Sequence, residues 1–242
     1  MSETSPFALI CHLGGDDRLS AALRQQVAAV AGSPAASVAE LRDLAVLALD
    51  SRAAWSEAFS AGSLVIGCRR PRAVRALLAQ AGVVLDQAAV TWIADPEPAD
   101  GLPPTTTGAW YPVIDRERCK DCGQCRQFCL FGVYTQDAAG HVRVEKPLHC
   151  KPGCPACARI CPAAAIVFPF CPDSPINGDA VPDDRKVAAD SAAWRERLAA
   201  NPMRALAARQ ARGATAGVDP ARLARALAER AAARPPAAQE GL

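Results

Sequence analysis

The chain of 242 residues is 50% hydrophobic and carries a formal net charge of +2 at pH 7. This length predicts one or two domains with enough apolar residues for a core, and a charge so close to neutral argues against nucleic-acid binding. No stretch has the length and apolar character of a membrane span, and the residues after Met1 lack the basic and apolar regions of a signal peptide. We therefore expect a soluble, cytoplasmic protein.

Residues 7–93 alternate short apolar runs with helical patterns. The apolar runs predict buried strands at residues 7–12, 63–68 and 90–93. Strands that alternate with helices form a parallel sheet with helices on its faces. We therefore expect a small α/β domain with a parallel sheet over residues 1–94.

Three segments between these strands have helical patterns. Residues 14–17 predict a turn and an N-cap, and apolar residues at helical spacing then predict a helix over residues 19–31. Residues 38–49 predict a second helix, although residues 44–49 also fit a buried strand. A third helix is expected to begin at Pro71 and to end at Gly82, because proline is favoured in the first helical turn.

Two cysteines follow predicted strands of this domain. Cys11 and Cys68 are expected at the carboxyl ends of parallel strands, where α/β sheets usually place their sites. One interpretation is that both are small buried apolar residues, which free cysteine resembles. The other is a thiol pair or partial metal site that faces a partner, in which Arg69, Arg70 and Arg72 lower the thiol pKa of Cys68.

Residues 119–161 contain eight of the chain's eleven cysteines, in two runs. Three thiols at positions i, i+3 and i+6, with a fourth shortly after, are typical of a loop that wraps one face of an iron–sulfur cubane. Disulfides are disfavoured in a chain without a secretory signal. Zinc bound by four cysteines is the alternative, but zinc sites use two pairs with a longer spacer between them.

The two runs resemble those of two-cluster bacterial ferredoxins, and the resemblance covers roughly residues 110–170. In that family the fourth cysteine of a run binds the other cluster. The resemblance therefore implies two [4Fe-4S] clusters with crossed ligands. Cluster 1 would be held by Cys119, Cys122, Cys125 and Cys161. Cluster 2 would be held by Cys129, Cys150, Cys154 and Cys157.

The cysteine runs depart from the family pattern at two places. Leu130 stands where the first run usually has proline, and three residues rather than two separate Cys150 from Cys154. The extra residue widens the loop around cluster 2, and we expect it to shift the potential of that cluster or to make it more labile. Cys171 is interpreted as a non-ligand, with replacement of Cys150 or Cys154 as the alternative.

The two-cluster ferredoxin domain is predicted over residues 109–180, with an α+β ferredoxin-like fold. Each half is expected to contain a strand, a cluster loop, a short helix and a strand, with strands at residues 113–114, 133–134, 142–144 and 166–168. Residues 137–140 supply the turn of a central hairpin. The aromatic residues of this stretch are expected to form a small core and to exclude water, and the clusters are expected to stabilise that core.

The α/β domain has a second resemblance. Residues 10–14 and 65–72 look like segments of the N-terminal domain of the flavin-containing subunit of heterodisulfide reductases. That family has a Cys-His-Cys-Gly segment after its first strand, and Leu13 replaces the second cysteine here. The resemblance implies the fold and an association with redox complexes, and nothing catalytic.

Two further segments complete the chain. Residues 95–108 are rich in proline and threonine, which predicts an extended, semi-rigid linker. Residues 181–242 are rich in alanine and arginine and are expected to form a helical or partly disordered tail, with helices near 192–206 and 220–233. These helices are either solvated or a docking tail for a partner.

The sequence thus predicts an electron carrier with two [4Fe-4S] clusters. It would relay single electrons between a donor and an acceptor protein, as a subunit of, or carrier for, a larger oxidoreductase, which the second resemblance suggests contains flavin. No acid, base or nucleophile constellation is evident, so we predict no catalytic residue and no enzyme activity of this chain alone. The alternatives are a redox enzyme subunit with thiol chemistry at Cys11 and Cys68, and an iron–sulfur redox sensor or assembly factor.

Overall fold

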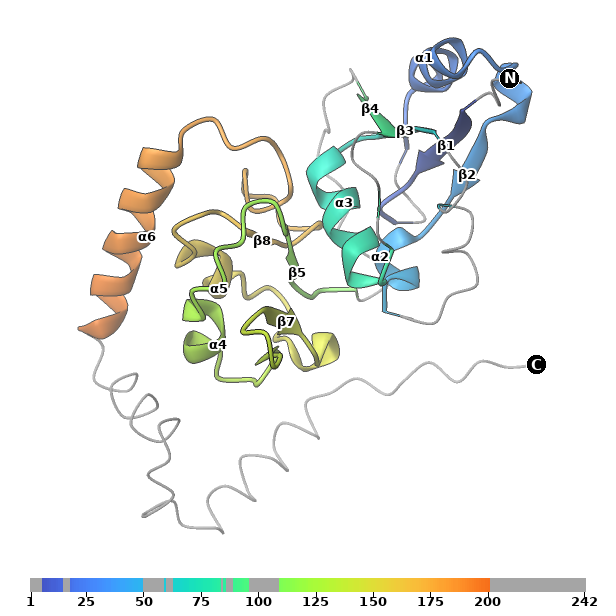
Figure 1. The fold of residues 1–242 in the computed structure, drawn as a ribbon. Helices are drawn as coiled ribbons and strands as arrows, with labels where there is room; N and C mark the ends of the chain where they lie inside the picture. Colours follow the sequence, from blue (N-terminus) through green and yellow to red (C-terminus); the bar gives the residue numbers. More distant parts are fainter. Residues whose placement is uncertain are drawn as a thin grey trace. The chain divides into compact units, whose positions relative to one another are not determined.

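The computed structural model describes residues 6–14, 18–49, 59, 63–83, 85, 89–95 and 109–200. Figure 1 shows two described assemblies of helices and strands joined through residues outside this set. The first is here called the α/β part (residues 6–95) and the second the cysteine-rich part (residues 109–180). The predicted linker, apart from Asp95, and the predicted helix near 220–233 lie outside the described residues.

The α/β part is built on a four-stranded parallel sheet in the order β2-β1-β3-β4. Its strands are β1 (Phe7–Cys11), β2 (Ala39–Leu41), β3 (Leu64–Cys68) and β4 (Val90–Ala94). Strand β3 lies inside the sheet with all its residues buried, as expected for a strand covered on both faces. The predicted α/β fold and the three predicted strands are confirmed, and β2 is an additional edge strand.

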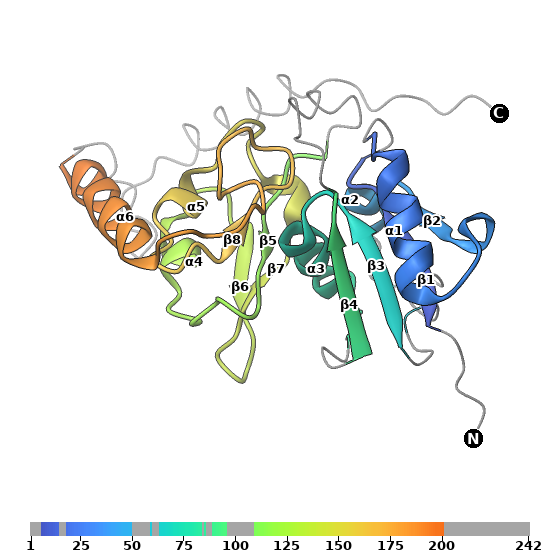
Figure 2. The same cartoon turned by 90° about the horizontal axis from the view of Figure 1, so that it is seen from above.

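Helix α1 (Ala21–Ala31) covers one face of this sheet (Figure 2). Its N-cap is Ser20, whose Oγ accepts a hydrogen bond from the Leu23 N–H at 3.1 Å and donates one to Asp95 Oδ1 at 2.6 Å. The prediction of a cap within residues 14–17 is therefore wrong, because the buried Ser20–Asp95 pair fixes the helix start. The predicted end at Ala31 is confirmed, with Gly32 in the left-handed conformation at φ 64°.

The predicted helix over residues 38–49 is wrong in its first part. A 3-10 turn, η1 (Ala35–Ser37), leads into β2, and only α2 (Leu44–Leu47) is helical. Residues 39–41 pair with β1, and Asp43 adopts a positive φ of 55° before α2. Pairing with the exposed edge of β1 outweighs the helical spacing of the apolar residues, since tertiary contacts routinely override propensity. The alternative of a strand at residues 44–49 is also wrong.

Helix α3 (Pro71–Gln80) covers the other face of the sheet and begins at the predicted proline. Figure 2 shows it between the sheet and the cysteine-rich part. Its buried residues, among them Val74 and Leu77, share one apolar core with Tyr111, Val113 and Val167 of the cysteine-rich part. The two parts therefore meet through a continuous hydrophobic core beneath α3.

The cysteine-rich part contains two small antiparallel ribbons and two short helices. Its elements are β5 (Val113–Ile114), α4 (Gln124–Phe128), β6 (Tyr134–Gln136), β7 (Val142–Val144), the 3-10 helix η4 (Pro147–His149), α5 (Ala156–Arg159) and β8 (Ile166–Val167). Strand β5 pairs with β8, and β6 pairs with β7. This arrangement agrees with the predicted halves, in which each cysteine run lies between two strands.

Helix α6 (Asp184–Ala199) follows the cysteine-rich part and begins earlier than the predicted helix near 192–206. Ser191 is buried, and its Oγ donates a hydrogen bond to the Ile160 carbonyl at 2.6 Å. Trp194 lies beneath the guanidinium of Arg159, 5.2 Å from the ring centroid. The first helix of the tail therefore packs on the segment before Cys161.

Substitution of Gly67 by alanine is expected to destabilise the α/β part. An added Cβ would lie 2.5 Å from Val27 Cγ2 of α1, and overpacking of a well-filled core costs about 1–3 kcal/mol. We expect Gly67→Ala to unfold at a lower urea concentration than the wild type, as followed by circular dichroism. Val27→Ala removes the clashing methyl groups, so the double variant should lose less stability than the sum of the single variants. Additive losses would contradict the close packing of α1 on β3.

Candidate metal centres

The first cysteine run lies on a tight loop between β5 and α4. Cys119 and Cys122 are in this loop, Cys125 is in α4, and Cys129 ends that helix. Asp121 and Gly123 have positive φ values of 47° and 70°, which curl the chain between the cysteines. The loop therefore turns its thiols toward a common centre.

Asp121 fastens this loop to the hairpin of β6 and β7. Its Oδ1 accepts a hydrogen bond from the Val142 N–H at 2.8 Å, and its Oδ2 lies 3.0 Å from His141 Nδ1. The bond with His141 lowers the pKa of the Asp121 carboxyl, which favours its charged form. An ionised carboxylate therefore bridges the cysteine loop and the hairpin.

The four thiols predicted for cluster 1 lie near one another. Burial raises the pKa of the Cys125 thiol to about 12, and the neighbouring thiolates add to the rise through charge repulsion. The thiolates that act on Cys125 are those of Cys161, Cys119 and Cys122. The structure thus brings Cys161, from the second run, to the cysteines of the first.

The second run lies between η4 and β8. Cys150 ends η4, Cys154 follows a turn, Cys157 is in α5, and Cys161 comes just after that helix. In the widened loop the Cys154 N–H donates a hydrogen bond to the Lys151 carbonyl at 3.1 Å, and Gly153 has a positive φ of 71°. The extra residue between Cys150 and Cys154 is therefore absorbed in a closed turn.

The four thiols predicted for cluster 2 also lie near one another. Burial raises the pKa of the Cys150 thiol to about 12, and the thiolates of Cys129 and Cys154 raise it further. Burial likewise raises the pKa of Cys157, the hydrogen bond from Tyr134 lowers it, and the thiolates of Cys150, Cys129 and Cys125 raise it further. Cys129 of the first run therefore lies near cysteines of the second, and the crossed ligand pattern stays a prediction.

The structure supplies hydrogen-bond donors to two of these sulfurs. The Tyr134 hydroxyl donates to Cys157 Sγ at 3.0 Å, and both groups are buried. The Ala165 N–H donates to Cys161 Sγ at 3.3 Å. Donors of this kind stabilise thiolate ligands and influence the potential of an iron–sulfur cluster.

The thiol groups fit the chemistry of a cubane. Each group gathers four soft thiol donors in a partly buried setting, and thiolates are the ligands that iron–sulfur clusters require. Within the described part of the chain, no three Cys, His, Asp or Glu side chains are placed to hold a single metal ion. That placement is compatible with a cubane, because its four thiolates bind four different iron atoms.

Cys171 lies in the core of the cysteine-rich part, beside Cys157 and Phe168. It is buried, and burial raises the pKa of its thiol. The thiols whose charges affect Cys150 and Cys157 do not include Cys171. Its interpretation as a non-ligand stays a prediction.

Cys11 and Cys68 are brought together but face no surface. They are opposite each other in the pairing of β1 and β3, and each is fully buried. Burial raises the pKa of the Cys11 thiol to about 12, so its reactive thiolate is disfavoured. The interpretation of both cysteines as small buried apolar residues is therefore confirmed, and the alternative of a thiol pair or partial metal site facing a partner is wrong.

The arginines predicted to activate Cys68 have other partners. Arg69 donates to the Arg18 carbonyl, and Arg70 donates to Asp179 Oδ1 at 2.9 Å and to the Pro169 carbonyl at 3.2 Å. Arg72 donates to Asp115 Oδ2 at 2.6 Å. Arg70 and Arg72 therefore join the α/β part to the cysteine-rich part.

The carboxyl edge of the sheet is covered by the segment over residues 169–179. The Phe170 ring lies 3.3 Å from the position a Cβ would take at Gly14, after β1. At Gly178 an added Cβ would lie 2.5 Å from Ala73 Cβ, at the start of α3. The crevice between β1 and β3, where the order of strands reverses and α/β sheets commonly bind ligands, is packed against this segment of the same chain.

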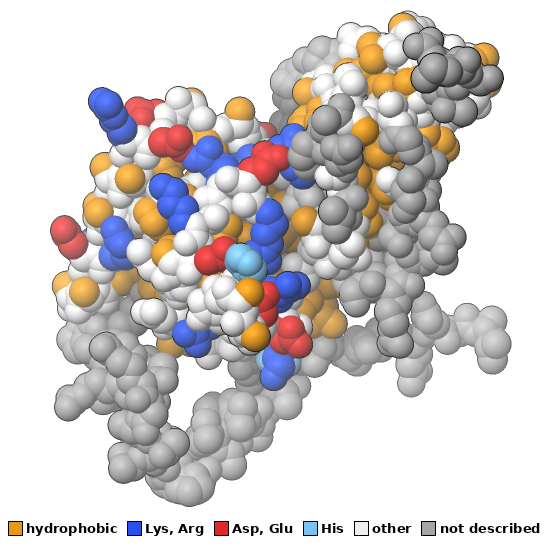
Figure 3. Space-filling view, viewed as in Figure 1, with side chains coloured by type: hydrophobic (Ala, Val, Ile, Leu, Met, Phe, Trp, Pro, Cys, Tyr) orange, Lys and Arg blue, Asp and Glu red, His pale blue; other side chains and the backbone are white. Residues whose placement is uncertain are grey.

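A groove of about 630 Å³ lies between α3 and the loop of the first cysteine run. Charges of both signs line it, including Arg75, Glu117, Asp121 and His141, and Val83 adds an apolar patch. Figure 3 shows basic and acidic side chains intermixed over the cysteine-rich part on this face. Cys122, in the same loop, is exposed.

Sequence reasoning did not assign the hydrogen-bonding roles of Tyr134, Asp121 and Arg72. Tyr134 was expected only as a core aromatic, and its distance from Cys157 along the chain conceals the bond to sulfur. The sequence could have indicated that Asp121 shapes the loop, since aspartate is enriched among non-glycine residues with positive φ. Arg72 belongs to a cluster of arginines, and the sequence does not show which way each of them points.

The chain is similar to ferredoxins and to a pyruvate synthase subunit over about a quarter of its length. An uncharacterized ferredoxin of Methanocaldococcus jannaschii is 45% identical over 62 residues, which are 25% of this chain and 42% of the relative. Pyruvate synthase subunit PorD of the same organism is 36% identical over 63 residues, which are 25% of this chain and 71% of the relative. A second ferredoxin of that organism is 34% identical over 58 residues, 23% of this chain and 74% of the relative.

These similarities define an iron–sulfur domain of the ferredoxin type, as the cysteine pattern predicted. The chain belongs to the ferredoxin family through this segment. No protein-family model matches the chain, and no solved structure gives a significant match. Among the described residues, no helix is long and apolar enough to cross a membrane.

Replacement of Tyr134 by phenylalanine is expected to lower the reduction potential of the cluster that Cys157 is predicted to bind. The variant loses a hydrogen bond to sulfur, which stabilises the more negative, reduced state. Redox titration of the iron-loaded protein should show the shift without loss of iron. Tyr111→Phe is the matched control, because the Tyr111 hydroxyl donates to the Ala45 carbonyl in the α/β part. Equal potentials in the wild type and Tyr134→Phe would contradict the assigned role.

Proposed function

We propose that the chain is an electron carrier that binds two [4Fe-4S] clusters. Cys119, Cys122, Cys125 and Cys161 would hold cluster 1, and Cys129, Cys150, Cys154 and Cys157 would hold cluster 2. The observation that best supports the proposal is that Cys161 of the second run lies near Cys125 of the first, and Cys129 of the first run lies near Cys150 of the second. Crossed ligands of this kind belong to two-cluster ferredoxins.

When bound, two clusters of this type would each supply one-electron oxidation and reduction. The chain's own residues hold the iron through thiolates and keep water away. Phe168 is fully buried next to the Trp110 ring, at a centroid distance of 5.3 Å, and Tyr134 is buried beside Cys157. Cys122 is exposed, so the cluster 1 loop offers a short path for electrons to a partner on the face with the mixed-charge groove.

We propose that the physiological partners are redox proteins, one donor and one acceptor, within a larger oxidoreductase. The similarity to pyruvate synthase subunit PorD supports a role as a subunit of such a complex. The resemblance of the α/β part to the heterodisulfide reductase flavin subunit stays a prediction and would favour a flavin-containing partner. The division into residues 1–94, 95–108, 109–180 and 181–242 is likewise proposed.

Thiol chemistry at Cys11 and Cys68 is the less favoured function. Both side chains are fully buried, and the Cys11 thiol has a pKa of about 12. A substrate disulfide would need access to a thiolate, which this environment disfavours. We therefore assign the two cysteines to the core of the α/β part and electron transfer to the cysteine-rich part.

Pairs of cysteine variants test the crossed ligands. Cys129→Ala with Cys150→Ala removes two ligands of cluster 2 and should leave one reduced [4Fe-4S] spin per chain in dithionite-treated samples. Cys129→Ala with Cys119→Ala removes one ligand of each cluster and should leave none. Cys171→Ala is the control and should keep both spins. The opposite result for the two double variants would show that each run holds its own cluster.

Protein-film voltammetry of the iron-loaded chain tests the relay. We expect two reversible one-electron waves of equal area, because each cluster exchanges one electron with the electrode. Cys161→Ala should show a single wave. Irreversible reduction with release of iron would reject the carrier and would favour a redox sensor.

A further inference from the structure

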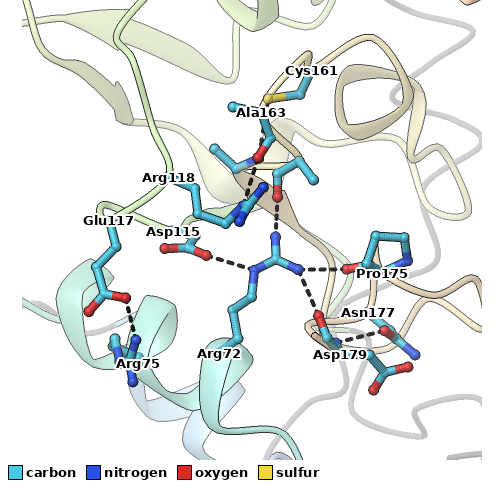
Figure 4. A network of polar contacts seen from close by, with 12 residues as sticks. Arg72, Arg75, Asp115, Glu117, Arg118, Cys161, Ala163, Pro175, Asn177 and Asp179 are labelled. Atoms are coloured by element: carbon cyan, nitrogen blue, oxygen red, sulfur yellow. Dashed lines mark hydrogen bonds and ion pairs between the residues drawn. The ribbon is translucent and has the colours of Figure 1, made fainter. Parts of the chain in front are cut away.

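Arg72 extends from the first turn of α3, in the α/β part, into the cysteine-rich part (Figure 4). Its Nε donates to Asp115 Oδ2 at 2.6 Å, and the side chains of this ion pair are 12% and 5% exposed. One terminal nitrogen donates to the Pro175 and Asp179 carbonyls, each at 2.9 Å. The other terminal nitrogen donates to the Ala164 carbonyl. All three guanidinium nitrogens thus donate hydrogen bonds to the cysteine-rich part.

The Ala164 carbonyl belongs to a peptide group that also contacts a predicted cluster ligand. The N–H of that same peptide group is the Ala165 N–H, which donates to Cys161 Sγ at 3.3 Å. Because a peptide group is planar, a contact that fixes its carbonyl also fixes the direction of its N–H. Hydrogen bonds in series also polarise one another, so a bond from a cation to the carbonyl strengthens the N–H as a donor.

The turn that presents this peptide group is held in an unusual conformation. Ala164 has a positive φ of 48°, a region that residues other than glycine rarely adopt. Such conformations persist where surrounding contacts impose them. Arg72 binds the Ala164 carbonyl, and Arg118 donates to the preceding Ala163 carbonyl at 2.8 Å. The two arginines therefore bind successive carbonyls of the turn after Cys161.

The partner of Arg72 acts on the other segment of the same predicted centre. The Asp115 carbonyl accepts a hydrogen bond from the Cys119 N–H at 3.0 Å, and the Asp115 N–H donates to the Ala165 carbonyl at 2.8 Å. The buried Arg72–Asp115 pair therefore contacts the turns of both Cys119 and Cys161. Screening by salt is weak for a buried pair, and the Arg72 charge offsets that of Asp115 beside the predicted cluster site.

We propose that Arg72 is a positioning residue for cluster 1, and that through it the α/β part sets the potential of that cluster. This inference rests on the proposed binding of cluster 1 by Cys161. The Arg72 charge and the hydrogen bond that it directs to Cys161 both stabilise the more negative, reduced state. The α/β part would thus tune cluster 1 and leave cluster 2 unaffected.

The test compares Arg72→Gln, Arg72→Lys and the control Arg75→Gln. Arg75 lies on the same helix and pairs with Glu117 at the more exposed rim of the groove. For each iron-loaded full-length protein, iron and sulfide are counted and the two potentials are measured by redox titration. Hyperfine-shifted cysteine protons report each cluster, and the signals that the double variant Cys129→Ala with Cys150→Ala retains are assigned to cluster 1.

Arg72→Gln is expected to lower the potential of cluster 1 alone, because both the charge and the directed hydrogen bond are lost. Arg72→Lys keeps the charge without the planar fork and should give a smaller shift. Arg75→Gln should match the wild type. If Arg72→Gln fails to fold or loses iron, the potential of cluster 1 in Arg72→Lys is used to test the inference instead. Unchanged potentials in the variants that retain both clusters, or equal shifts of both clusters, would overturn the inference. A wild type without two reducible clusters would instead reject the proposed function.

Discussion

The gathering of eight cysteine thiols in one small, partly buried region is the main physical constraint on the cysteine-rich part. Desolvation and neighbouring thiolates both raise the pKa of Cys125 and Cys150 to about 12, so the empty protein favours the neutral thiols. A bound cluster would lower the cost of ionising these thiols, because iron would offset the negative charge of the thiolates. The core around them is small and includes Cys157 and Cys171 among its buried residues. The fold of this part is therefore expected to depend on the cluster in the way that small metal domains depend on their metal.

The α/β part contributes apolar and polar contacts to the segments that carry the proposed cluster ligands. Helix α3 shares its apolar core with β5 and β8, and Arg70 and Arg72 extend from its start into the segment over residues 163–179. The sheet edge that commonly binds a ligand in α/β proteins is packed against that same segment. These contacts indicate that the α/β part supports the segments that carry the proposed cluster ligands.

The sequence predicted those features that have a local cause. Buried strands, the proline at the start of α3 and the glycine at the end of α1 each follow from neighbouring residues. It did not predict β2, because pairing with the edge of β1 is a tertiary contact, or the N-cap of α1, because Ser20 is fixed by Asp95 far along the chain. The proposed ligand groups came from the resemblance to two-cluster ferredoxins, whereas the roles of Tyr134 and Arg72 depend on contacts between distant segments.

The most direct test of the central claim is Mössbauer spectroscopy of the anaerobically prepared, iron-57-loaded chain, together with counts of iron and acid-labile sulfide. Two clusters predict about eight iron and eight sulfide per chain, with all iron in the oxidised [4Fe-4S] form before reduction. About four iron would show that one of the two thiol groups holds no cluster. Zinc without sulfide would contradict the account altogether.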